Sequence, residues 1–179
     1  MKYSNFDSIA SIQTTLNLTT VFLLLGSNLE DPEKQLQTAR TLIAQKVGKI
    51  DQSSSVYWSA PWGNEDQPAF LNQALQLSTD YNADDLLRHL LSIEQEMGRQ
   101  RLVKWGSRVI DIDILYYGQE IVSTTHLKIP HPEIANRRFV LSPLNEIAPD
   151  FRHPVLNLTT AVLLERCKDE LEVKVVSGQ

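Results

Sequence analysis

The chain has 179 residues, which is enough for one domain with a single sizeable core. Apolar residues make up 42% of the chain and charged residues 22%, as in an ordinary globular protein, and no apolar run approaches the roughly 20 residues of a membrane-spanning helix. The formal net charge of −5 argues against general binding to nucleic acids or anionic membranes, whose phosphates are bound by basic surfaces.

Residues 1–19 contain many Ser and Thr and lack both the apolar segment of a secretory signal and the arginine-rich pattern of an organelle-targeting peptide. We expect them to form a flexible tail or a tag-like extension, and residues 20–179 to form a single domain of a cytoplasmic protein. No repeat or linker divides this second range. A monomer is the expected state, with a homodimer as the alternative, and neither nucleic acid nor a membrane is an expected partner.

The domain is predicted to start with a strand and then a helix. Residues 21–25 are a short apolar run that ends at Gly26, as in a buried strand. Asp31 followed by Pro32 is typical of a helix start, because an aspartate caps the first turn and a proline fits its first position. Apolar residues at helical spacing extend this helix over about 32–47.

Two further strands and a second helix are predicted next. Residues 56–58 favour a strand, and residues 71–77 show the alternation of leucine with other residues that a strand requires. Asn82 is a good N-cap for a helix whose apolar stripe covers 83–97. Gly98 is placed to end that helix.

The last third of the chain predicts shorter elements. Residues 109–117 read as a strand that is followed by a turn at Gly118. The lone cysteine, Cys167, excludes an intrachain disulfide, and we interpret it as a small apolar side chain. The other predicted elements are a short strand near Ile121, a short helix from Pro132, a helix over 161–167 and a strand over 173–176.

Helices alternate with strands along the chain, and tight turns join some of the strands. This pattern predicts an α+β sandwich with a mostly antiparallel sheet.

Residues 108–115, Arg-Val-Ile-Asp-Ile-Asp-Ile-Leu, carry the most chemical information. In a strand, Asp111 and Asp113 project from the same face, with Cα atoms about 6.5–7 Å apart. Two carboxylates this close repel each other unless a cation neutralises them, and oxygen ligands favour Mg²⁺. The alternative is a solvated acidic face, although the same face would also carry Val109, Leu115 and Tyr117.

A basic segment directly before this strand favours a metal–triphosphate site. Residues 99–108 contain four positive charges. In a metal–triphosphate complex, guanidinium groups can form paired hydrogen bonds to the phosphate oxygens that Mg²⁺ does not bind. The alternative is that these charges only form salt bridges with the two aspartates. Because Arg108 lies three residues before Asp111, it reaches the phosphates only if residue 108 still belongs to the loop.

Neither a Walker A motif nor a Gly-x-Gly-x-x-Gly motif is present, so nucleotide binding would rest on side chains and metal. A zinc deaminase site at residues 131–133 is excluded because the Pro-Cys-x-x-Cys partner is missing. Taken alone, Phe70 and Phe139 are more often core residues than ligand platforms, and His131 is more often structural than catalytic.

Together these segments resemble the 6-hydroxymethyl-7,8-dihydropterin pyrophosphokinase family of the folate pathway, in the family's order from about residue 21 to 150. The matching pieces are Leu25-Gly26-Ser27-Asn28-Leu29, Pro61 to Gly63, Asp66-Gln67-Pro68-Ala69-Phe70-Leu71-Asn72, Glu94, Gly98-Arg99, Lys104-Trp105-Gly106-Ser107-Arg108-Val109-Ile110-Asp111-Ile112-Asp113-Ile114, Pro130-His131, Asn136-Arg137-Arg138-Phe139, Pro143-Leu144 and Glu146-Ile147-Ala148-Pro149. The resemblance implies a ferredoxin-like α/β/α sandwich. It also implies transfer of the β,γ-diphosphate of ATP to the pterin hydroxymethyl oxygen, with release of AMP.

The resemblance also implies roles for individual residues. Asp111 and Asp113 would hold two Mg²⁺ ions, and Arg99 and Arg108 would stabilise the transferring phosphates. The pterin would contact Ser59, Ala60, Trp62, Phe70, Asn72, Asp111 and Phe139, with the two phenylalanines stacked on its faces. ATP would contact Glu94, Arg99, Arg101, Lys104, Trp105, Arg108, Ile114, His131 and Arg137.

Three departures from the family pattern are modest. The loop between Arg99 and Trp105 is one residue shorter than in many relatives, Phe70 replaces a common tyrosine, and Pro132 replaces a frequent aromatic residue. None removes the carboxylates or the essential arginines, so an active enzyme is expected. The alternatives are a non-catalytic ferredoxin-like binding or regulatory module and an ATP-dependent kinase that releases ADP.

Overall fold

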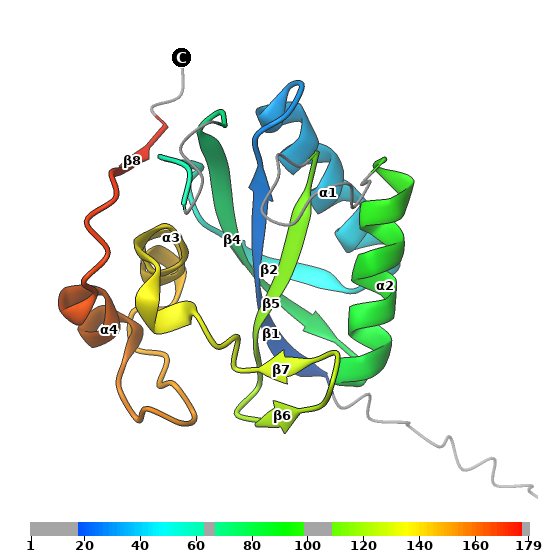
Figure 1. Cartoon of the computed structure of the whole chain (residues 1–179). Helices are drawn as coiled ribbons and strands as arrows, with labels where there is room; N and C mark the ends of the chain where they lie inside the picture. Colours follow the sequence, from blue (N-terminus) through cyan, green and yellow to red (C-terminus); the bar gives the residue numbers. More distant parts are fainter. Residues whose placement is uncertain (1–17, 63–66, 99–108, 177–179) are drawn as a thin grey trace, which may run out of the picture.

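The computed structural model describes residues 18–62, 67–98 and 109–176 (Figure 1). Among these residues no helix has the length and apolar character needed to cross a bilayer. The elements, in chain order, are β1 (Thr19–Ser27), α1 (Pro32–Lys46), β2 (Lys49–Ser53), β3 (Tyr57–Ser59), β4 (Phe70–Thr79), α2 (Ala83–Glu96), β5 (Asp111–Tyr117), β6 (Val122–Ser123), β7 (Lys128–Ile129), the 3₁₀ helix η1 (Ile134–Asn136), α3 (Arg138–Ile147), α4 (Thr160–Arg166) and β8 (Val173–Val175).

The main sheet has the strand order β5-β1-β4-β3-β8. β2 also pairs with β4, along residues 75–78, whereas β3 pairs with residues 70–72 of the same strand. All of these pairings are antiparallel. The elements β1-α1-β2-β4-α2-β5 give the order β5-β1-β4-β2, which is the ferredoxin-like βαββαβ arrangement. The predicted fold class is therefore confirmed.

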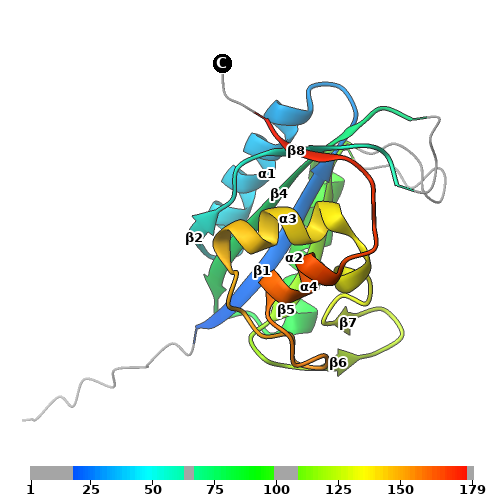
Figure 2. The same cartoon turned by 90° about the vertical axis from the view of Figure 1, so that its left-hand side faces the viewer.

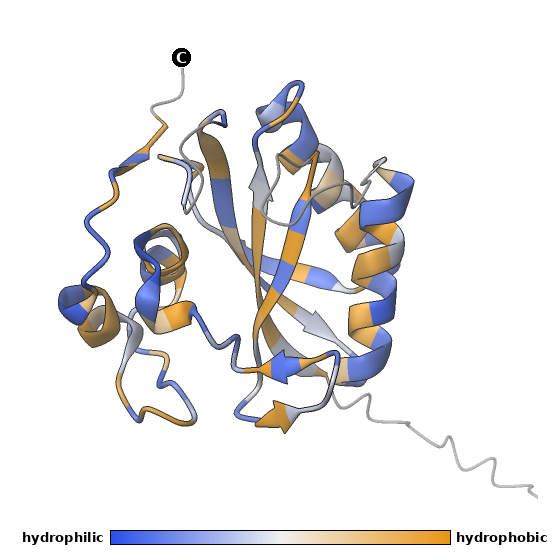
Figure 3. Cartoon of the chain, in the orientation of Figure 1, coloured by the Kyte–Doolittle hydropathy of each residue, from blue (hydrophilic) through white to orange (hydrophobic). Residues whose placement is uncertain are grey.

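Helices cover both faces of this sheet, so the domain has three layers. α1 and α2 lie on one face and α3 and α4 on the other (Figure 1), and Figure 2 shows α3 and α4 lying across their face of the sheet. The side of α2 that faces the sheet is largely apolar (Figure 3). Each face of the sheet therefore has its own apolar core.

β1 contributes to both cores, which explains its continuous apolar run. Leu23 and Leu25 pack in the first core, under α1 and α2, whereas Phe22 and Leu24 pack in the second core, under α3 and α4. All four side chains are at most 4% exposed. Burial of each such side chain stabilises the fold by about 1.5–3 kcal/mol, which fixes β1 at the centre of the sheet.

The predicted helix boundaries have clear local causes. The Asp31 side chain accepts a hydrogen bond from the Lys34 amide at 3.2 Å, and Asn82 caps α2 in the same way. Gly98, just after α2, has a φ of +86°, a conformation that glycine adopts without a steric penalty. The predicted starts of α1 and α2 and the predicted stop of α2 are confirmed.

Some elements differ from the sequence-based expectations. β2 was not predicted, because its five residues are mostly polar and exposed. α3 was not predicted either, because it contains Pro143 and has no side-chain cap of its own. The helix expected from Pro132 is only the 3₁₀ turn η1, and β5 begins at Asp111 rather than at residue 109.

β5 contains a bulge at Leu115, the extra residue in its pairing with β1. Leu115 and its neighbour Tyr116 both pack in the second core, so the regular alternation of the strand is broken there. Tyr117 consequently packs in the first core. The prediction that Tyr117 shares the face of Asp111 and Asp113 is therefore wrong, because the bulge reverses the alternation.

Candidate active site

The paired carboxylates stand on the outer strand of the ferredoxin-like unit, next to β1. Asp111 is the register partner of Gly26, and Gly26 is in turn the partner of Asn72 on β4. Asp113 lies opposite Leu24 in the next row. The antiparallel register thus places both carboxylates and the Asn72 amide on one floor that spans three strands.

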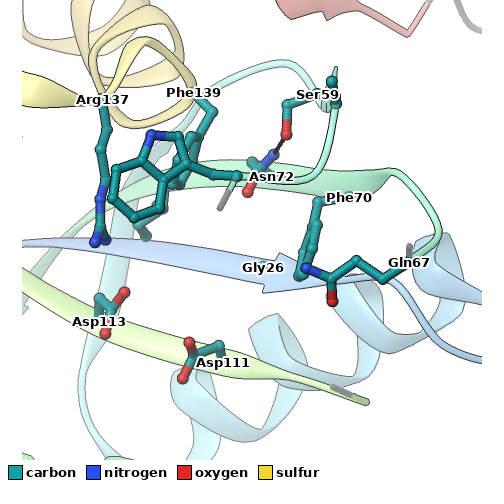
Figure 4. Close-up of a pocket in the computed structure, with 12 residues that line it drawn as sticks. Gly26, Ser59, Gln67, Phe70, Asn72, Asp111, Asp113, Arg137 and Phe139 are labelled. Atoms are coloured by element: carbon teal, nitrogen blue, oxygen red, sulfur yellow. Dashed lines mark hydrogen bonds between the residues drawn. The ribbon is translucent and has the colours of Figure 1, made fainter. Parts of the chain in front are cut away.

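A pocket lies over this floor, on the face of the sheet that α3 covers (Figure 4). Besides the strands, the β3–β4 segment and the start of α3 contribute to its wall. The residues that line it are Leu24, Gly26, Ser59, Ala60, Trp62, Gln67, Phe70, Asn72, Asp111, Asp113, Arg137 and Phe139. All seven residues predicted to contact a pterin are among them.

Three lining residues were missed by the sequence-based prediction: Leu24, Gly26 and Gln67. Gly26 could not be identified from the sequence alone, because its place in the pocket depends on strand register. It lies between Asp111 of β5 and Asn72 of β4. A Cβ atom built on Gly26 would come within 3.5 Å of the Asn72 Oδ1 atom. The missing side chain therefore leaves space at the floor of the pocket.

The buried Asn72 amide has a fixed direction. Its Nδ2 atom donates a hydrogen bond to the Ser59 hydroxyl at 2.9 Å, which joins β4 to β3 across the pocket (Figure 4). Asn72 and Ser59 are each 2% exposed. Because one amide proton is used in this way, the Oδ1 atom is directed to the Gly26 side as an acceptor.

Aromatic rings and one guanidinium group form the wall next to α3. The Arg137 guanidinium lies 4.5 Å from the centre of the Trp62 ring and 5.8 Å from that of Phe139. Figure 4 shows Arg137 directed toward the side of the pocket that Asp113 lines. Phe70, at the start of β4, lines the pocket farther along the sheet. The pocket thus has an aromatic side and an anionic side, with Arg137 between them.

Glu94 supports the carboxylate strand from the opposite layer. It is 2% exposed on α2, and its Oε1 atom accepts a hydrogen bond from the Ile112 amide at 2.7 Å. Ile112 lies between Asp111 and Asp113 on a strand whose other edge pairs with β1. Glu94 therefore holds the backbone between the two carboxylates, and a nucleotide contact by Glu94 stays a prediction.

His131 follows β7 and is held by hydrogen bonds to the backbone of β5 and of the residues that follow it. Its amide donates to the Leu115 carbonyl at 3.0 Å, and its Nδ1 atom accepts from the Glu133 amide at 3.2 Å. Burial lowers the pKa of the imidazole, and the Arg137 charge lowers it further. With Nδ1 as the acceptor, the neutral ring carries its proton on Nε2, which is then a hydrogen-bond donor.

The remaining predicted site residues are placed as follows. The Ile114 side chain is 5% exposed in the first core, so only its backbone remains available for a ligand. Arg99, Arg101, Lys104, Trp105 and Arg108 lie outside the described residues, and so does the prediction that Arg108 belongs to a loop.

The donor set of the carboxylate pair fits Mg²⁺. Among residues 18–62, 67–98 and 109–176, no three His, Cys, Asp or Glu side chains form a metal cage. Asp111 and Asp113 would thus supply only part of a coordination shell. Mg²⁺ suits such a site, because it usually keeps several water molecules and binds substrate phosphates.

Comparisons with known proteins show which family the chain belongs to. The sequence model of the family described as 7,8-dihydro-6-hydroxymethylpterin-pyrophosphokinase (HPPK) matches residues 22–149. The chain is 41% identical over 147 residues to the Haemophilus influenzae 2-amino-4-hydroxy-6-hydroxymethyldihydropteridine pyrophosphokinase, which covers 82% of this chain and 92% of that protein. It is 41% identical over 138 residues to the Aquifex aeolicus protein of the same name, with coverage of 77% and 86%.

Longer proteins also contain a similar region. The chain is 43% identical over 140 residues to the Dictyostelium discoideum folic acid synthesis protein FOL1, covering 78% of this chain but only 21% of that protein. A Plasmodium falciparum HPPK-DHPS structure with pterin and p-hydroxybenzoate shares the fold, with a TM-score of 0.70, 18% identity, and coverage of 83% of this chain and 43% of that one. Since the family model matches most of the chain and full-length relatives match closely, this protein belongs to the 7,8-dihydro-6-hydroxymethylpterin-pyrophosphokinase family.

Proposed function

We propose that this protein transfers the β,γ-diphosphate of ATP to the hydroxymethyl group of 6-hydroxymethyl-7,8-dihydropterin and releases AMP, as a step of folate synthesis. One structural observation supports this proposal independently of the family match. A single pocket combines an amide and aromatic recognition surface with two carboxylates on the same floor. A heterocyclic acceptor and a metal-bound polyphosphate would thus meet within one cavity.

The aromatic side of the pocket suits a flat heterocycle that carries hydrogen-bond donors. Phe70 and Phe139 supply ring faces, and such rings pack well against planar groups. The Oδ1 atom of Asn72 is fixed as an acceptor by the bond from Nδ2 to Ser59, and would accept a hydrogen bond from an N–H group on the pyrimidine edge of the pterin. The empty position at Gly26 leaves room for that edge beside the sheet.

The anionic side of the pocket suits the phosphates. Two Mg²⁺ ions, held by Asp111 and Asp113 together with phosphate oxygens, would neutralise the charge of the transferring group. Arg137 lines the same pocket and would place a guanidinium near the nucleotide. His131 would offer Nε2–H as a neutral donor. Arg99 and Arg108 complete the proposed set.

The reaction needs positioning and charge neutralisation more than covalent help from the protein. The hydroxymethyl oxygen forms a bond to the β-phosphorus while the bond from that phosphorus to the α,β-bridging oxygen breaks. AMP leaves with the bridging oxygen, and the hydroxyl proton passes to solvent. A pocket that holds the acceptor oxygen and the β-phosphorus in line would lower the barrier chiefly by orientation and electrostatics.

The experiment that tests this function is a product analysis. The purified chain is incubated with ATP, MgCl₂ and 6-hydroxymethyl-7,8-dihydropterin, and the nucleotides and pterins are separated by chromatography and identified by mass. AMP and a pterin diphosphate in equal amounts are expected. ADP in place of AMP would indicate a kinase of another type, and pterin binding without turnover would indicate a non-catalytic module. Either result would overturn the proposal.

The proposal also includes a monomeric protein that acts in the cytoplasm without a nucleic-acid or membrane partner. The formal net charge of −5 supports the absence of nucleic-acid binding. Light scattering of the purified chain would give its oligomeric state.

A further inference from the structure

The start of α3 is held by a segment that lies far away in the sequence. α3 has no side-chain cap from its own N-terminal residues. Instead, the Asp169 Oδ2 atom accepts a hydrogen bond from the Arg138 amide at 2.9 Å, and thus satisfies a backbone donor of the first turn. The other carboxylate oxygen of Asp169 accepts from the Leu171 amide at 3.1 Å. Both oxygens of this side chain are therefore engaged.

The Arg138 side chain adds two more bonds to the same segment. Its Nε atom donates to the Asp169 carbonyl at 2.8 Å, and its terminal nitrogen donates to the Cys167 carbonyl at 3.2 Å. The two neighbours of Arg138 in the chain, Arg137 and Phe139, both line the pocket. The residue between two pocket residues is thus anchored, through backbone and side chain, to the C-terminal segment.

The same segment then reaches β3, which carries another part of the pocket lining. β8 pairs with β3, and just beyond this pairing the Ala60 amide donates to the Glu172 carbonyl at 3.2 Å. β3 carries Ser59, which orients Asn72, and Ala60 and Trp62 follow it in the wall. One stretch of chain, residues 167–175, therefore contacts both the start of α3 and β3.

From these contacts we infer that residues 167–175, here called the C-terminal strap, hold the start of α3 beside β3, and that Asp169 is the positioning residue for Arg137 and Phe139. The strap lies outside residues 22–149, which the family model matches. The inference deepens the proposed function, because the ligand it concerns is the pterin acceptor. Asp169 itself does not line the pocket, so it acts through the first turn of α3.

Three variants test this role. Asp169→Ala removes both carboxylate acceptors, and Asp169→Asn keeps one oxygen for one of the two amides. Glu170→Ala is the matched control, because Glu170 is the exposed acidic neighbour. If the strap has this role, hydrogen exchange of the amides in the first turn of α3 should become about two- to thirtyfold faster in Asp169→Ala. This is the range that loss of a helix N-cap produces. Asp169→Asn should fall between this variant and the wild type.

Kinetics then separate positioning from general stability. In Asp169→Ala the KM for the pterin should rise at least about threefold, while kcat at saturating substrates changes less than twofold. Glu170→Ala should match the wild type in both. A lower Tm for Asp169→Ala with an unchanged pterin KM, or unchanged amide exchange at the start of α3, would overturn the inference.

The two proposals fail in different ways. A wild-type chain that forms no AMP and binds no pterin contradicts the proposed function, and also the ligand named for the strap. If the wild type is active and the Asp169→Ala variant behaves like Glu170→Ala, only the positioning role proposed for the strap is contradicted. The exchange measurement needs no substrate, so it tests the anchoring of α3 in either case.

Discussion

Asp111 and Asn72 lie in one row across three strands of the sheet, separated only by Gly26 of β1. The anionic group and the amide group thus face the same space, and the residue between them has no side chain. Because cross-strand neighbours lie about 4.5–5.5 Å apart, the row spans roughly the width of a small heterocycle. We therefore expect the specificity of the pocket to depend on this glycine as well as on the groups beside it.

Gly26→Ala should weaken acceptor binding without harming the fold. The added Cβ would meet the Asn72 oxygen at an ordinary 3.5 Å contact, so it fits the protein but fills the floor of the pocket. We expect the pterin KM to rise about tenfold, whereas stability should stay within about 0.5 kcal/mol or improve slightly, since alanine is favoured over glycine in a strand. Steady-state kinetics and thermal unfolding check both values.

Gly118→Ala is the opposite control for this prediction. Gly118 has a φ of +51°, so an alanine there is strained and should destabilise the fold by about 1 kcal/mol while the pterin KM stays unchanged. If Gly26→Ala instead lowered stability and left the KM unaltered, the pocket floor would not be where the acceptor binds.

Asp113→Asn should remove most of the turnover and leave the fold intact. An amide has the shape of the carboxylate but lacks its charge, and is therefore a poor ligand for Mg²⁺. We expect kcat to fall by about a hundredfold or more, with a higher Mg²⁺ requirement, whereas Tm should change by less than about 3 °C. The exposed Asp150→Asn serves as the control, because it makes the same chemical change away from the pocket. Normal turnover of Asp113→Asn would contradict the proposed metal site.

Glu94→Ala and Glu94→Gln separate a supporting role from a direct one. Alanine leaves the buried Ile112 amide without the acceptor that now lies at 2.7 Å, which should cost about 1–3 kcal/mol of unfolding free energy. Glutamine keeps an oxygen for this bond, so it should restore most of the stability and of kcat. Chemical denaturation and kinetics of the two variants provide the check. Equal loss of activity in both, with stability restored only by glutamine, would show that the charge of Glu94 acts on the substrates.

The sequence predicted which residues share the pocket better than it predicted the sheet register that brings them together. The spacing of Asp111 and Asp113 was sufficient to predict a shared face, because strand alternation is a local property. The contribution of Gly26 was not predictable in this way, since it depends on the register between β1, β4 and β5. Likewise, the bulge at Leu115 follows from pairing with β1 and moved Tyr117 to the other core.

α3 shows why an element that lines the pocket can be missed. Its interior Pro143 and the absence of a local cap both argue against a helix when the sequence is considered alone. Its stability comes from tertiary contacts: Val140, Leu141 and Leu144 are buried in the second core, and Asp169 caps its first turn from a distance. Neither kind of contact leaves a signal within the helix itself.

The last prediction concerns the other end of α3, where Glu146 joins the helix to the segment before and within β3. Its Oε1 atom accepts from the Ser55 amide and hydroxyl, both at 2.9 Å, and its Oε2 atom accepts from the Tyr57 hydroxyl at 2.8 Å. Burial alone would raise the pKa of this carboxyl, but the three hydrogen bonds outweigh it and lower the pKa below the usual value of 4.5.

The sign of the pH effect follows from that direction. A carboxyl whose pKa is lower in the folded than in the unfolded state contributes stability above the unfolded pKa, and the contribution disappears as the pH falls through the folded pKa. The alkaline side of the profile depends on Tyr57. Burial, and then the neighbouring Glu146, raise the pKa of its hydroxyl to about 12. Its contribution to stability is therefore present below pH 10 and is lost as the pH rises through about 12. Between these limits both groups stabilise the contact.

Glu146→Gln should therefore flatten the acid side of the stability profile. Because Glu146 is exposed and screened by solvent, we expect the wild type to exceed the variant by only about 0.5 kcal/mol at pH 7, and the difference to vanish below the folded pKa. Urea unfolding at pH 7 and at several values below pH 4.5 measures this, with Tyr57→Phe as the partner variant. A difference that stayed constant down to pH 3 would mean that the carboxylate charge does not hold α3 to β3.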